Sequence, residues 1–341
     1  MIFVTGGTGL IGSHLLFQLV SAGKKVRALK RESSDTAKVL KTFSYYSGKP
    51  EELFHRIEWV NGDILDYFKL EKLLCNVEEV YHCAAVVSFS RKERKNMIHN
   101  NVEGTANMVN ATLENGAKKF CHVSSVSALG PNLNGYATDE LTNWVPSKKM
   151  TAYSQSKFFS ETEIWRGIEE GLDAVIVNPS IVLGPGNWDS GSSQLFKTVH
   201  NGLKFYTKGV TGYVDVKDVA QAMVLLMDDS HFETCKNQRF LLNAENLSYR
   251  DVFFQMADAM NQPRPKYFAS KLMLAVAWRA ASLVRMLSGG GPEITRETAA
   301  AAGNVTRFDG SKITRTTGFQ YLPISESISQ TAAFLKRDMA G

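Results

Sequence analysis

MIFVTGGTGLIG, residues 1–12, is a short apolar run that stops in a glycine-rich loop. Gly6, Gly9 and Gly12 follow the spacing G-x-x-G-x-x-G, and the helical pattern SHLLFQLVSAG comes next, with Gly23 as its expected C-cap. Glycine permits a tight turn and close backbone approach, and a helix N-terminus offers free N–H groups to a pyrophosphate. The stretch therefore predicts a strand, a nucleotide-binding loop and a helix, with a merely flexible turn as the alternative. The expected nucleotide contacts are Gly6, Thr8, Gly9, Leu10, Ile11 and Gly12.

Further apolar runs continue this pattern along the chain. They are KKVRAL, RIEWV, EEVYHCA, KKFCHVSS and DAVIVNPS, and helical patterns separate most of them. Strands that alternate with helices form a parallel sheet covered on both faces. Six such strands within about the first 180 residues predict an α/β fold with a Rossmann-type doubly wound parallel sheet.

The regular alternation fades after Pro185. SSQLFKTVHNGL predicts a helix, GYVDVKDVAQAMVLLM a short strand followed by a helix, and QRFLLNA another strand. We expect a nucleotide-binding Rossmann domain over residues 1–185 and a smaller, mixed substrate-binding region over residues 186–341. A segment at about 210–245 is expected to return to the Rossmann domain.

The composition is that of an ordinary globular protein. Of the 341 residues, 44% are hydrophobic and 21% are charged, and the chain is long enough to bury a sizeable core. The formal net charge of +5 is spread along the chain without a dense Lys/Arg block. The charge pattern therefore does not indicate nucleic-acid binding.

Four cysteines show neither metal-knuckle nor C-x-x-C spacing: Cys75, Cys83, Cys121 and Cys235. Cys83 and Cys121 lie in apolar, strand-like runs and are expected to be buried free thiols. A reducing compartment fits such thiols, and no signal peptide is expected before a strand that begins at Met1 or Ile2. We therefore expect a cytoplasmic protein.

The residues after the second predicted strand favour NADP(H) as the cofactor. NAD sites usually place an acidic residue there, whereas a basic residue accommodates the 2′-phosphate of NADP. Here the strand runs into Lys30 and Arg31, followed by Glu32 and Ser33. We expect Lys30 and Arg31 to contact the phosphate. NAD(H) is the alternative cofactor if Glu32 faces the ribose, and a solvated loop is the alternative role for the two cations.

The stretch NGDILD, residues 61–66, follows the third predicted strand. Asp63 either accepts a hydrogen bond from the adenine amino group or caps the next helix, and the chemistry alone leaves both open. Asp63 and its neighbour Ile64 belong to the expected cofactor-binding set.

The stretch TAYSQSK, residues 151–157, places Tyr153 and Lys157 four residues apart. On a helix this spacing puts both side chains on one face. An ammonium near a phenol favours the phenolate, so we expect Lys157 to lower the pKa of Tyr153. The pair would then act as an acid/base for proton transfer to or from an oxygen. An ordinary solvated pair is the alternative, because the pattern alone is weak.

These segments together resemble the extended branch of the short-chain dehydrogenase/reductase superfamily, also called the NAD-dependent epimerase/dehydratase family. The resemblance covers nearly the whole chain. The matching segments, in the family's order, are TGGTGLIG, VYHCAA from Val80, NNVEGTANMV from Asn100, VSSVSALG from Val123, YSQSK, and NPSIVLGPG from Asn178. Their joint occurrence is highly specific.

The resemblance implies catalytic roles for matching residues. Tyr153 is the acid/base, and Lys157 lowers its pKa and holds the nicotinamide ribose. Ser125, five residues before Gly130, hydrogen-bonds the substrate oxygen, a role we do not expect for Ser124. A ketone reduced by hydride develops negative charge on oxygen, which a proton from Tyr153 and a hydrogen bond from Ser125 would stabilise.

The resemblance also implies supporting and cofactor-binding residues. Asn101 matches the family's helix asparagine, which supports the lysine through water. Ala84 and Ala85 match backbone positions that line the cofactor, and Asn178 and Pro179 join the cofactor-binding set.

Within the family, VNPSIVLGPG and SKFFSE look most like the dihydroflavonol 4-reductase, cinnamoyl-CoA reductase and 3β-hydroxysteroid dehydrogenase group, which also includes hopanoid-associated sugar epimerases. The chain lacks the N-W-Y-C-Y motif of cinnamoyl-CoA reductases. Val126 and Ser127 stand where dehydratases of the branch usually have Asp-Glu, which argues against dehydration.

Three functions follow from this likeness. The first is an NADP(H)-dependent oxidoreductase for the carbonyl or secondary alcohol of a moderately apolar small molecule. The second is a nucleotide-sugar epimerase with tightly bound NAD, in which Arg239 and Arg250 are candidates for holding a diphosphate. The third is a non-catalytic redox sensor, against which the intact Ser125, Tyr153 and Lys157 set argues. Family members are often dimers through the helix that carries the tyrosine, so a homodimer is expected.

The segment KLMLAVAWRAASLVRML, residues 271–287, is long and apolar. Lys271, Arg279 and Arg285 make it a poor transmembrane span, and with Ser282 they fall within an arc of roughly 120° on a helix. We favour a buried helix or a lid over the substrate cavity, with a membrane-surface helix or a dimer surface as alternatives. Other candidates for an apolar cavity are Phe89, Trp144, Trp188, Phe205 and Tyr206.

Overall fold

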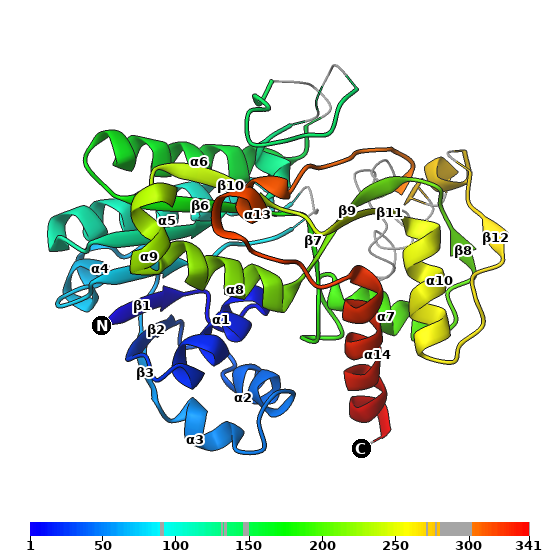
Figure 1. Ribbon diagram of the computed structural model, residues 1–341, viewed down its shortest axis with the longest axis horizontal. Helices are drawn as coiled ribbons and strands as arrows, with labels where there is room; N and C mark the ends of the chain where they lie inside the picture. The colour runs from blue at the N-terminus through cyan, green and yellow to red at the C-terminus, as the bar shows by residue number, and fades with distance from the viewer. Residues whose placement is uncertain are drawn as a thin grey trace.

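A seven-stranded sheet, in which every neighbouring pair of strands is parallel, lies at the centre of the protein (Figure 1). The computed structural model describes residues 1–88, 92–130, 132, 135–145, 150–270, 272–276, 278–279 and 302–340. The strand order is β10-β6-β5-β4-β1-β2-β3. The strands are β1 (Ile2–Thr5), β2 (Val26–Lys30), β3 (Ile57–Asn61), β4 (Glu79–His82), β5 (Lys119–Val123), β6 (Ala174–Pro179) and β10 (Gln238–Leu242).

The order of the strands confirms the doubly wound fold. The chain enters at β1 in the middle of the sheet, adds β2 and β3 on one side, and then crosses to place β4, β5 and β6 on the other. The six strands predicted from the sequence are β1 to β6. Such a reversal creates a crevice at the carboxyl ends of the strands where ligands bind.

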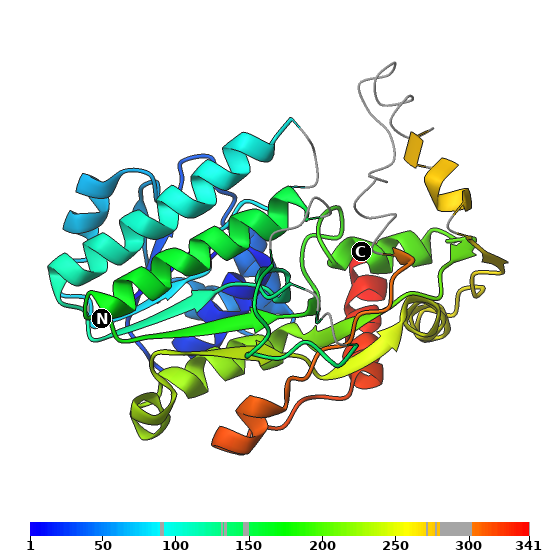
Figure 2. The same ribbon diagram turned by 90° about the horizontal axis from the view of Figure 1, so that it is seen from above.

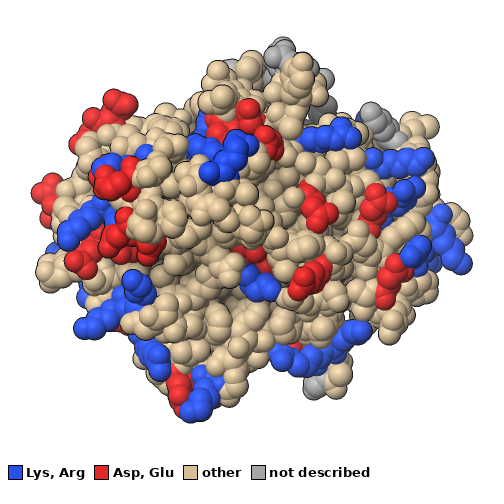
Figure 3. Space-filling model, in the orientation of Figure 1, with Lys and Arg blue, Asp and Glu red and all other residues tan. Residues whose placement is uncertain are grey.

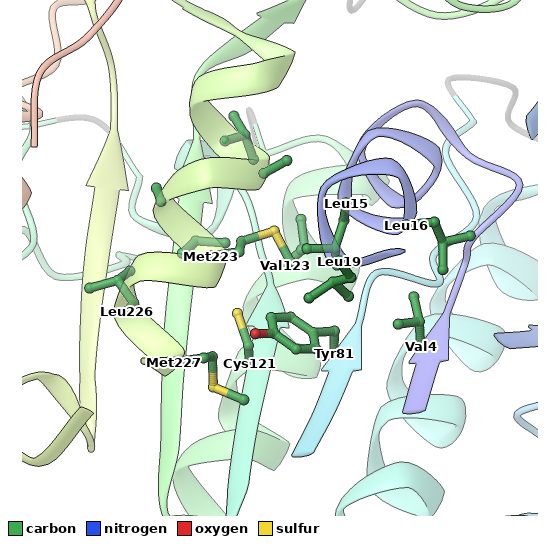
Figure 4. Close-up of a cluster of buried hydrophobic side chains, with 14 of the residues drawn as sticks. Val4, Leu15, Leu16, Leu19, Tyr81, Cys121, Val123, Met223, Leu226 and Met227 are labelled. Carbon is green, nitrogen blue, oxygen red and sulfur yellow. The ribbon is translucent and has the colours of Figure 1, made fainter. Parts of the chain in front are cut away.

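Helices cover both faces of this sheet (Figures 1 and 2). One face carries α1 (Leu10–Ser21) and α8 (Val216–Met227), and the other carries α4 (Tyr67–Leu73), α5 (Arg94–Asn115) and α6 (Ala152–Glu169). Because successive strand residues point to opposite faces, Val4 and Tyr81 join the α1–α8 core, whereas Phe3 and Val80 join the α5–α6 core. Figure 4 shows Tyr81 packed with Leu19 and Met223 in the first of these cores.

Shorter helices flank the half of the protein that is built on the seven-stranded sheet. They are α2 (Ala37–Ser44), α3 (Pro50–Phe54), the single 3₁₀ turn η1 (Val126–Ala128) and α9 (Asp229–Cys235). The turn η1 follows β5 and begins directly after Ser125.

The C-terminal region builds a smaller mixed structure with its own core. A three-stranded sheet has the order β11-β9-β7, with β9 parallel to β7 and antiparallel to β11, and β8 pairs with β12. These strands are β7 (Ile181–Leu183), β8 (Phe205–Tyr206), β9 (Val210–Asp215), β11 (Glu245–Ser248) and β12 (Tyr267–Phe268). The helices are α7 (Ser193–His200), α10 (Tyr249–Ala259), α13 (Ser311–Thr317) and α14 (Ile324–Ala340), and the core includes Phe196, Tyr213, Met256 and Leu335.

The two parts of the chain are interleaved. After β9 in the small sheet, α8 packs against α1 and β10 pairs with β6, so residues 216–242 complete the half built on the seven-stranded sheet. Before it, β7 at residues 181–183 already pairs with β9. The sheet of each half therefore depends on strands from either side of Pro185.

The described residues of the 271–287 segment lie on the surface. Residues 272–276 and 278–279 are helical, and the exposed fractions of Leu272 and Val276 are 76% and 60%. The prediction of a buried helix is therefore wrong for these residues, because the apolar side chains face outward. The rest of the segment, and Phe89, lie outside the described residues. In the part of the chain that the structure describes, no helix is long and apolar enough to cross a membrane.

All four cysteines are free thiols. Cys121 is buried, as the sequence predicts, whereas Cys83 is only half-buried because it lies where β4 runs out into the loop beside the glycine turn.

Candidate active site

The predicted site residues come together because they follow the carboxyl ends of neighbouring parallel strands. The glycine loop follows β1, Lys30 ends β2, and Asp63 lies just beyond β3. Ala84 and Ala85 come after β4, Ser125 after β5, and Asn178 and Pro179 end β6. Parallel strands end at one edge of a sheet, so residues scattered over 170 positions meet at the crevice beside β1 and β4.

The glycine loop is shaped for close backbone approach. Gly6 has φ +69°, and a Cβ there would lie 2.5 Å from the Ala84 nitrogen. A Cβ on Gly12 would lie 2.2 Å from the Gly6 carbonyl oxygen. Gly9 is the N-cap of α1 and has no side chain to bond the first-turn N–H groups. These groups therefore face the crevice as a ready-made anion site, and the loop fits a dinucleotide pyrophosphate.

The loop after β2 presents the two predicted cations differently. Lys30 ends the strand and is half-buried, whereas Arg31 is exposed. The Ser34 hydroxyl accepts a hydrogen bond from the Arg31 backbone N–H at 3.1 Å, which closes a tight turn. Glu32 and Ser33 are exposed on this turn.

The structure of the loop after β3 excludes one of the two roles considered for Asp63. The carboxylate that caps α4 is that of Asp66, which accepts a hydrogen bond from the Lys69 N–H at 3.1 Å. Asp63 instead accepts from the Leu65 N–H at 3.0 Å and remains half-buried beside the crevice. The helix-cap alternative for Asp63 is wrong, because α4 begins one turn later than the pattern suggested.

Asn101 fixes the loop that carries Ala84 and Ala85. Its side chain, 2% exposed, accepts from the Val86 N–H at 2.7 Å and donates to the Val86 carbonyl at 2.9 Å. It also donates to the Ser156 hydroxyl at 3.2 Å on α6. Asn101 thus joins α5, α6 and the loop after β4. Its support of Lys157 through water stays a prediction.

Ser125 and Tyr153 face each other across the start of α6. Thr151 caps this helix by accepting from the Ser154 N–H, and the Ser154 hydroxyl donates to the Ser127 carbonyl at 2.6 Å. That bond holds the first turn of α6 against η1, which follows Ser125. Burial raises the pKa of the Tyr153 phenol, and the nearby Ser125 hydroxyl opposes this rise.

Lys157 is buried behind this pair. Its ammonium donates to the Val123 carbonyl at 2.9 Å, and only 4% of the residue is exposed. Burial lowers the pKa of Lys157 to about 8, although Cys83 and Glu161 act in the opposite direction. The pKa of Tyr153 is therefore raised and not lowered in this structure, because desolvation dominates at the phenol and the ammonium donates to Val123. Stabilisation of the phenolate by Lys157 stays a prediction.

A buried carboxylate that the sequence reasoning missed lies behind the site. One oxygen of Glu161 accepts from the Ser124 hydroxyl at 2.6 Å and from the Asn178 amide at 2.8 Å. The other accepts from the Arg239 guanidinium at 3.1 Å. The Asn178 amide also donates to the Ser125 carbonyl at 3.1 Å. The sequence contained a pattern that could have identified Glu161, since this residue follows Lys157 by one helical turn on the same face.

Several residues proposed for the substrate side have other contacts. Trp144 stacks on Phe158 with ring centroids 4.1 Å apart, and the Trp188 indole donates to Asp338 at 2.9 Å. Phe205 is 45% exposed. In the described part of the chain, these side chains therefore take part in separate contacts.

The family model for the NAD dependent epimerase/dehydratase family matches residues 2–236. A Synechocystis sp. protein assigned by name to the dihydroflavonol 4-reductases is 29% identical over 336 residues, covering 96% of this chain and 92% of its own. Sterol demethylase protein B of Methylococcus capsulatus is 29% identical over 279 residues, covering 80% of this chain and 79% of its own.

The crystal structure of UDP-glucose 4-epimerase from Thermotoga maritima, with UDP-glucose, superposes with a TM-score of 0.76. It is 20% identical and covers 99% of each chain, which shows the shared fold. The chain belongs to the NAD-dependent epimerase/dehydratase family. It is an NAD(P)-dependent oxidoreductase of the extended short-chain dehydrogenase/reductase type, as the sequence predicts.

Replacing Glu161 with glutamine should destabilise the protein by about 3 kcal/mol, because breaking a buried ion pair leaves its partner uncompensated. An amide in this place cannot accept all four hydrogen bonds, from Ser124, Asn178, Trp165 and Arg239. The free energy of unfolding in urea measures the effect.

Glu163→Gln on the same helix is the matched control. Glu163 is 25% exposed and pairs with the partly exposed Arg166, so its loss should cost less than about 1 kcal/mol. Equal losses in the two variants would contradict the role given to Glu161.

Proposed function

We propose that the protein is an NADP(H)-dependent oxidoreductase that uses Tyr153 as its acid/base. The observation that carries this proposal is that Ser125 lies close enough to Tyr153 to act on its phenol, at the crevice beside the glycine loop. Lys157 lies one helical turn beyond Tyr153 and is buried, whereas Tyr153 is half-buried. This set offers a proton donor and a second hydrogen bond for a developing oxyanion.

The proton chemistry favours reduction of a carbonyl. A bound nicotinamide supplies the hydride. Because burial raises the pKa of Tyr153, its phenol is protonated at neutral pH and can donate to the substrate oxygen. Ser125 hydrogen-bonds the same oxygen, and the Lys157 ammonium balances the negative charge left on the phenolate after Tyr153 gives up its proton.

The substrate we propose is a moderately apolar carbonyl compound or its secondary alcohol. The relatives assigned as a dihydroflavonol 4-reductase and as sterol demethylase protein B support this class by name. The residue after Ser125 is Val126, which offers no carboxylate for a dehydration step.

A nucleotide-sugar epimerase with tightly bound NAD is the second candidate, and the fold shared with UDP-glucose 4-epimerase favours it. The two arginines considered for a diphosphate are engaged elsewhere. Arg239 bonds the Glu161 carboxylate and the Glu140 carbonyl, and Arg250 pairs with Asp251. These contacts favour the reductase.

We also propose that the chain forms a homodimer through the outer faces of α5 and α6. A shallow hollow of about 320 Å³ lies between the two helices and is lined in part by Ile98, Val102 and Phe159. Phe159 is 43% exposed. Apolar side chains in such a hollow suit a self-complementary contact.

Tyr153→Phe should lower the turnover of a reducible ketone by about 10²- to 10⁴-fold while leaving NADPH affinity largely intact, because only the transferable proton is removed. Steady-state rates and the dissociation constant of NADPH measure the two effects. Tyr136→Phe is the control, since Tyr136 is 78% exposed. Undiminished turnover in Tyr153→Phe would disprove the acid/base role.

Arg31→Ala, alone or with Lys30→Ala, should weaken NADPH binding about 10- to 100-fold and NADH binding much less, because a charge-assisted contact to the 2′-phosphate is lost. Titration calorimetry with each cofactor measures this ratio. Lys24→Ala serves as the control, because Lys24 is exposed just before β2 begins, at the other end of the strand from Lys30. Equal losses for both cofactors would refute phosphate recognition.

The nucleotide released when the purified protein is denatured separates the two candidate functions. The reductase should release little nucleotide, and the native protein should then bind NADPH in preference to NADH. Stoichiometric release of NAD would instead support an epimerase that recycles its own hydride. Chromatography of the released nucleotide gives the answer before any substrate is known.

A further inference from the structure

An exposed apolar face lies at the edge of the C-terminal region, on β8, β12 and the helical residues that follow them (Figure 1). Between 44% and 76% of each of its residues is exposed to solvent. We define the apolar face by five residues: Phe205, Tyr267, Leu272, Met273 and Val276. Phe268 lies on the other side of the ribbon, against Tyr206. The five are among fourteen large apolar residues that are exposed in the described part of the chain, and they lie close together in the sequence or in register.

The strand part of the apolar face is held in place by pairing and ring contacts. Tyr267 and Phe205 are in register across the parallel pair, and their ring centroids lie 5.7 Å apart. Tyr206 beside them packs on Phe254 of α10, which anchors the strands to the C-terminal core. The exposed rings therefore sit on a fixed support.

The helical part follows β12 directly along the chain. Ser270 begins the helical turns, since its carbonyl accepts from the Leu274 N–H and its hydroxyl from the Met273 N–H. At about 100° per residue, Leu272, Val276 and Met273 span an arc of roughly 100° on one side of the helix. Figure 2 shows these turns projecting from the body of the molecule. The apolar side of the helix is thus presented outward.

Basic side chains surround the apolar face. Lys204, Lys208 and Lys266 are exposed on or next to β8 and β12, and Arg279 is exposed one turn beyond Val276. None of these four forms an ion pair with any described residue. The nearby acids Asp251 and Asp258 are paired with arginines of their own. Figure 3 shows several Lys and Arg side chains, with some acidic side chains between them, along the edge of the molecule that carries β8 and β12 in Figure 1.

We propose that the apolar face is a docking surface for an anionic membrane surface. Aromatic and aliphatic side chains on one side of a short helix and ribbon enter the headgroup region, while surrounding cations meet anionic lipids. A second copy of the chain fits less well. In a two-fold contact the same patch meets itself, so the four cations would face cations. Membrane contact here requires no spanning helix.

Co-sedimentation of the full chain with lipid vesicles tests the proposal. We expect binding to vesicles of phosphatidylcholine mixed with phosphatidylglycerol to exceed binding to phosphatidylcholine alone by about tenfold, and to weaken as salt is raised. The triple variant Leu272→Ser/Met273→Ser/Val276→Ser should lose about tenfold or more in vesicle affinity. Lys204→Gln/Lys208→Gln/Lys266→Gln should lose about 10- to 100-fold on the anionic vesicles.

Matched variants elsewhere on the surface serve as controls. Phe68→Ser/Leu141→Ser removes two exposed apolar side chains outside the face, and Lys24→Gln/Lys25→Gln/Lys118→Gln removes three exposed cations. Both should bind vesicles as the parent does. Absence of binding to anionic vesicles, or equal losses in the controls, would overturn the proposal. So would an analytical ultracentrifugation result in which the apolar triple variant only dissociates a dimer and leaves vesicle binding unchanged.

Discussion

The pairing of β1 with β2 on one side and with β4 on the other is the constraint on which the rest of the structure depends. Since all these strands are parallel, their carboxyl ends lie at one edge, and the loops that leave β1 and β4 run close together there. Gly6 lets those two loops come within van der Waals distance because it lacks a side chain. The glycine loop, the loop after β3 and the helix that carries Tyr153 are arranged around that contact.

The chemistry of the site depends on burial as much as on charge. Desolvation raises the pKa of Tyr153 and lowers that of Lys157, so it favours the neutral form of both groups. Formal charge is concentrated one layer deeper, where Glu161 meets Arg239 and holds Ser124 and Asn178. A fixed ion pair thus lies behind a tyrosine that is neutral until proton transfer and a lysine that is mostly protonated at neutral pH.

The sequence predicted the features that follow from local pattern. The glycine spacing, the six strands and their alternation with helices were sufficient for the doubly wound sheet, and the sheet then brings Ser125 beside Tyr153. Features that depend on distant partners were not predictable. Glu161 finds Ser124 and Arg239 at separations of 37 and 78 residues. The direction of the Tyr153 pKa was predicted wrongly, because spacing indicates proximity to Lys157 but says nothing of desolvation or of the Val123 carbonyl.

The position of β10 at the end of the sheet has a consequence for how the chain is made. Every residue of β6 is buried, and β10 covers its outer edge. Until the ribosome has added the residues from Ser180 to Leu242, β6 has one unpaired edge. At about 5–20 residues per second this interval lasts roughly 3 to 12 seconds. During it, the nascent chain exposes an apolar strand edge of the kind that recruits other chains, so chaperone binding would be most useful just before β10 emerges.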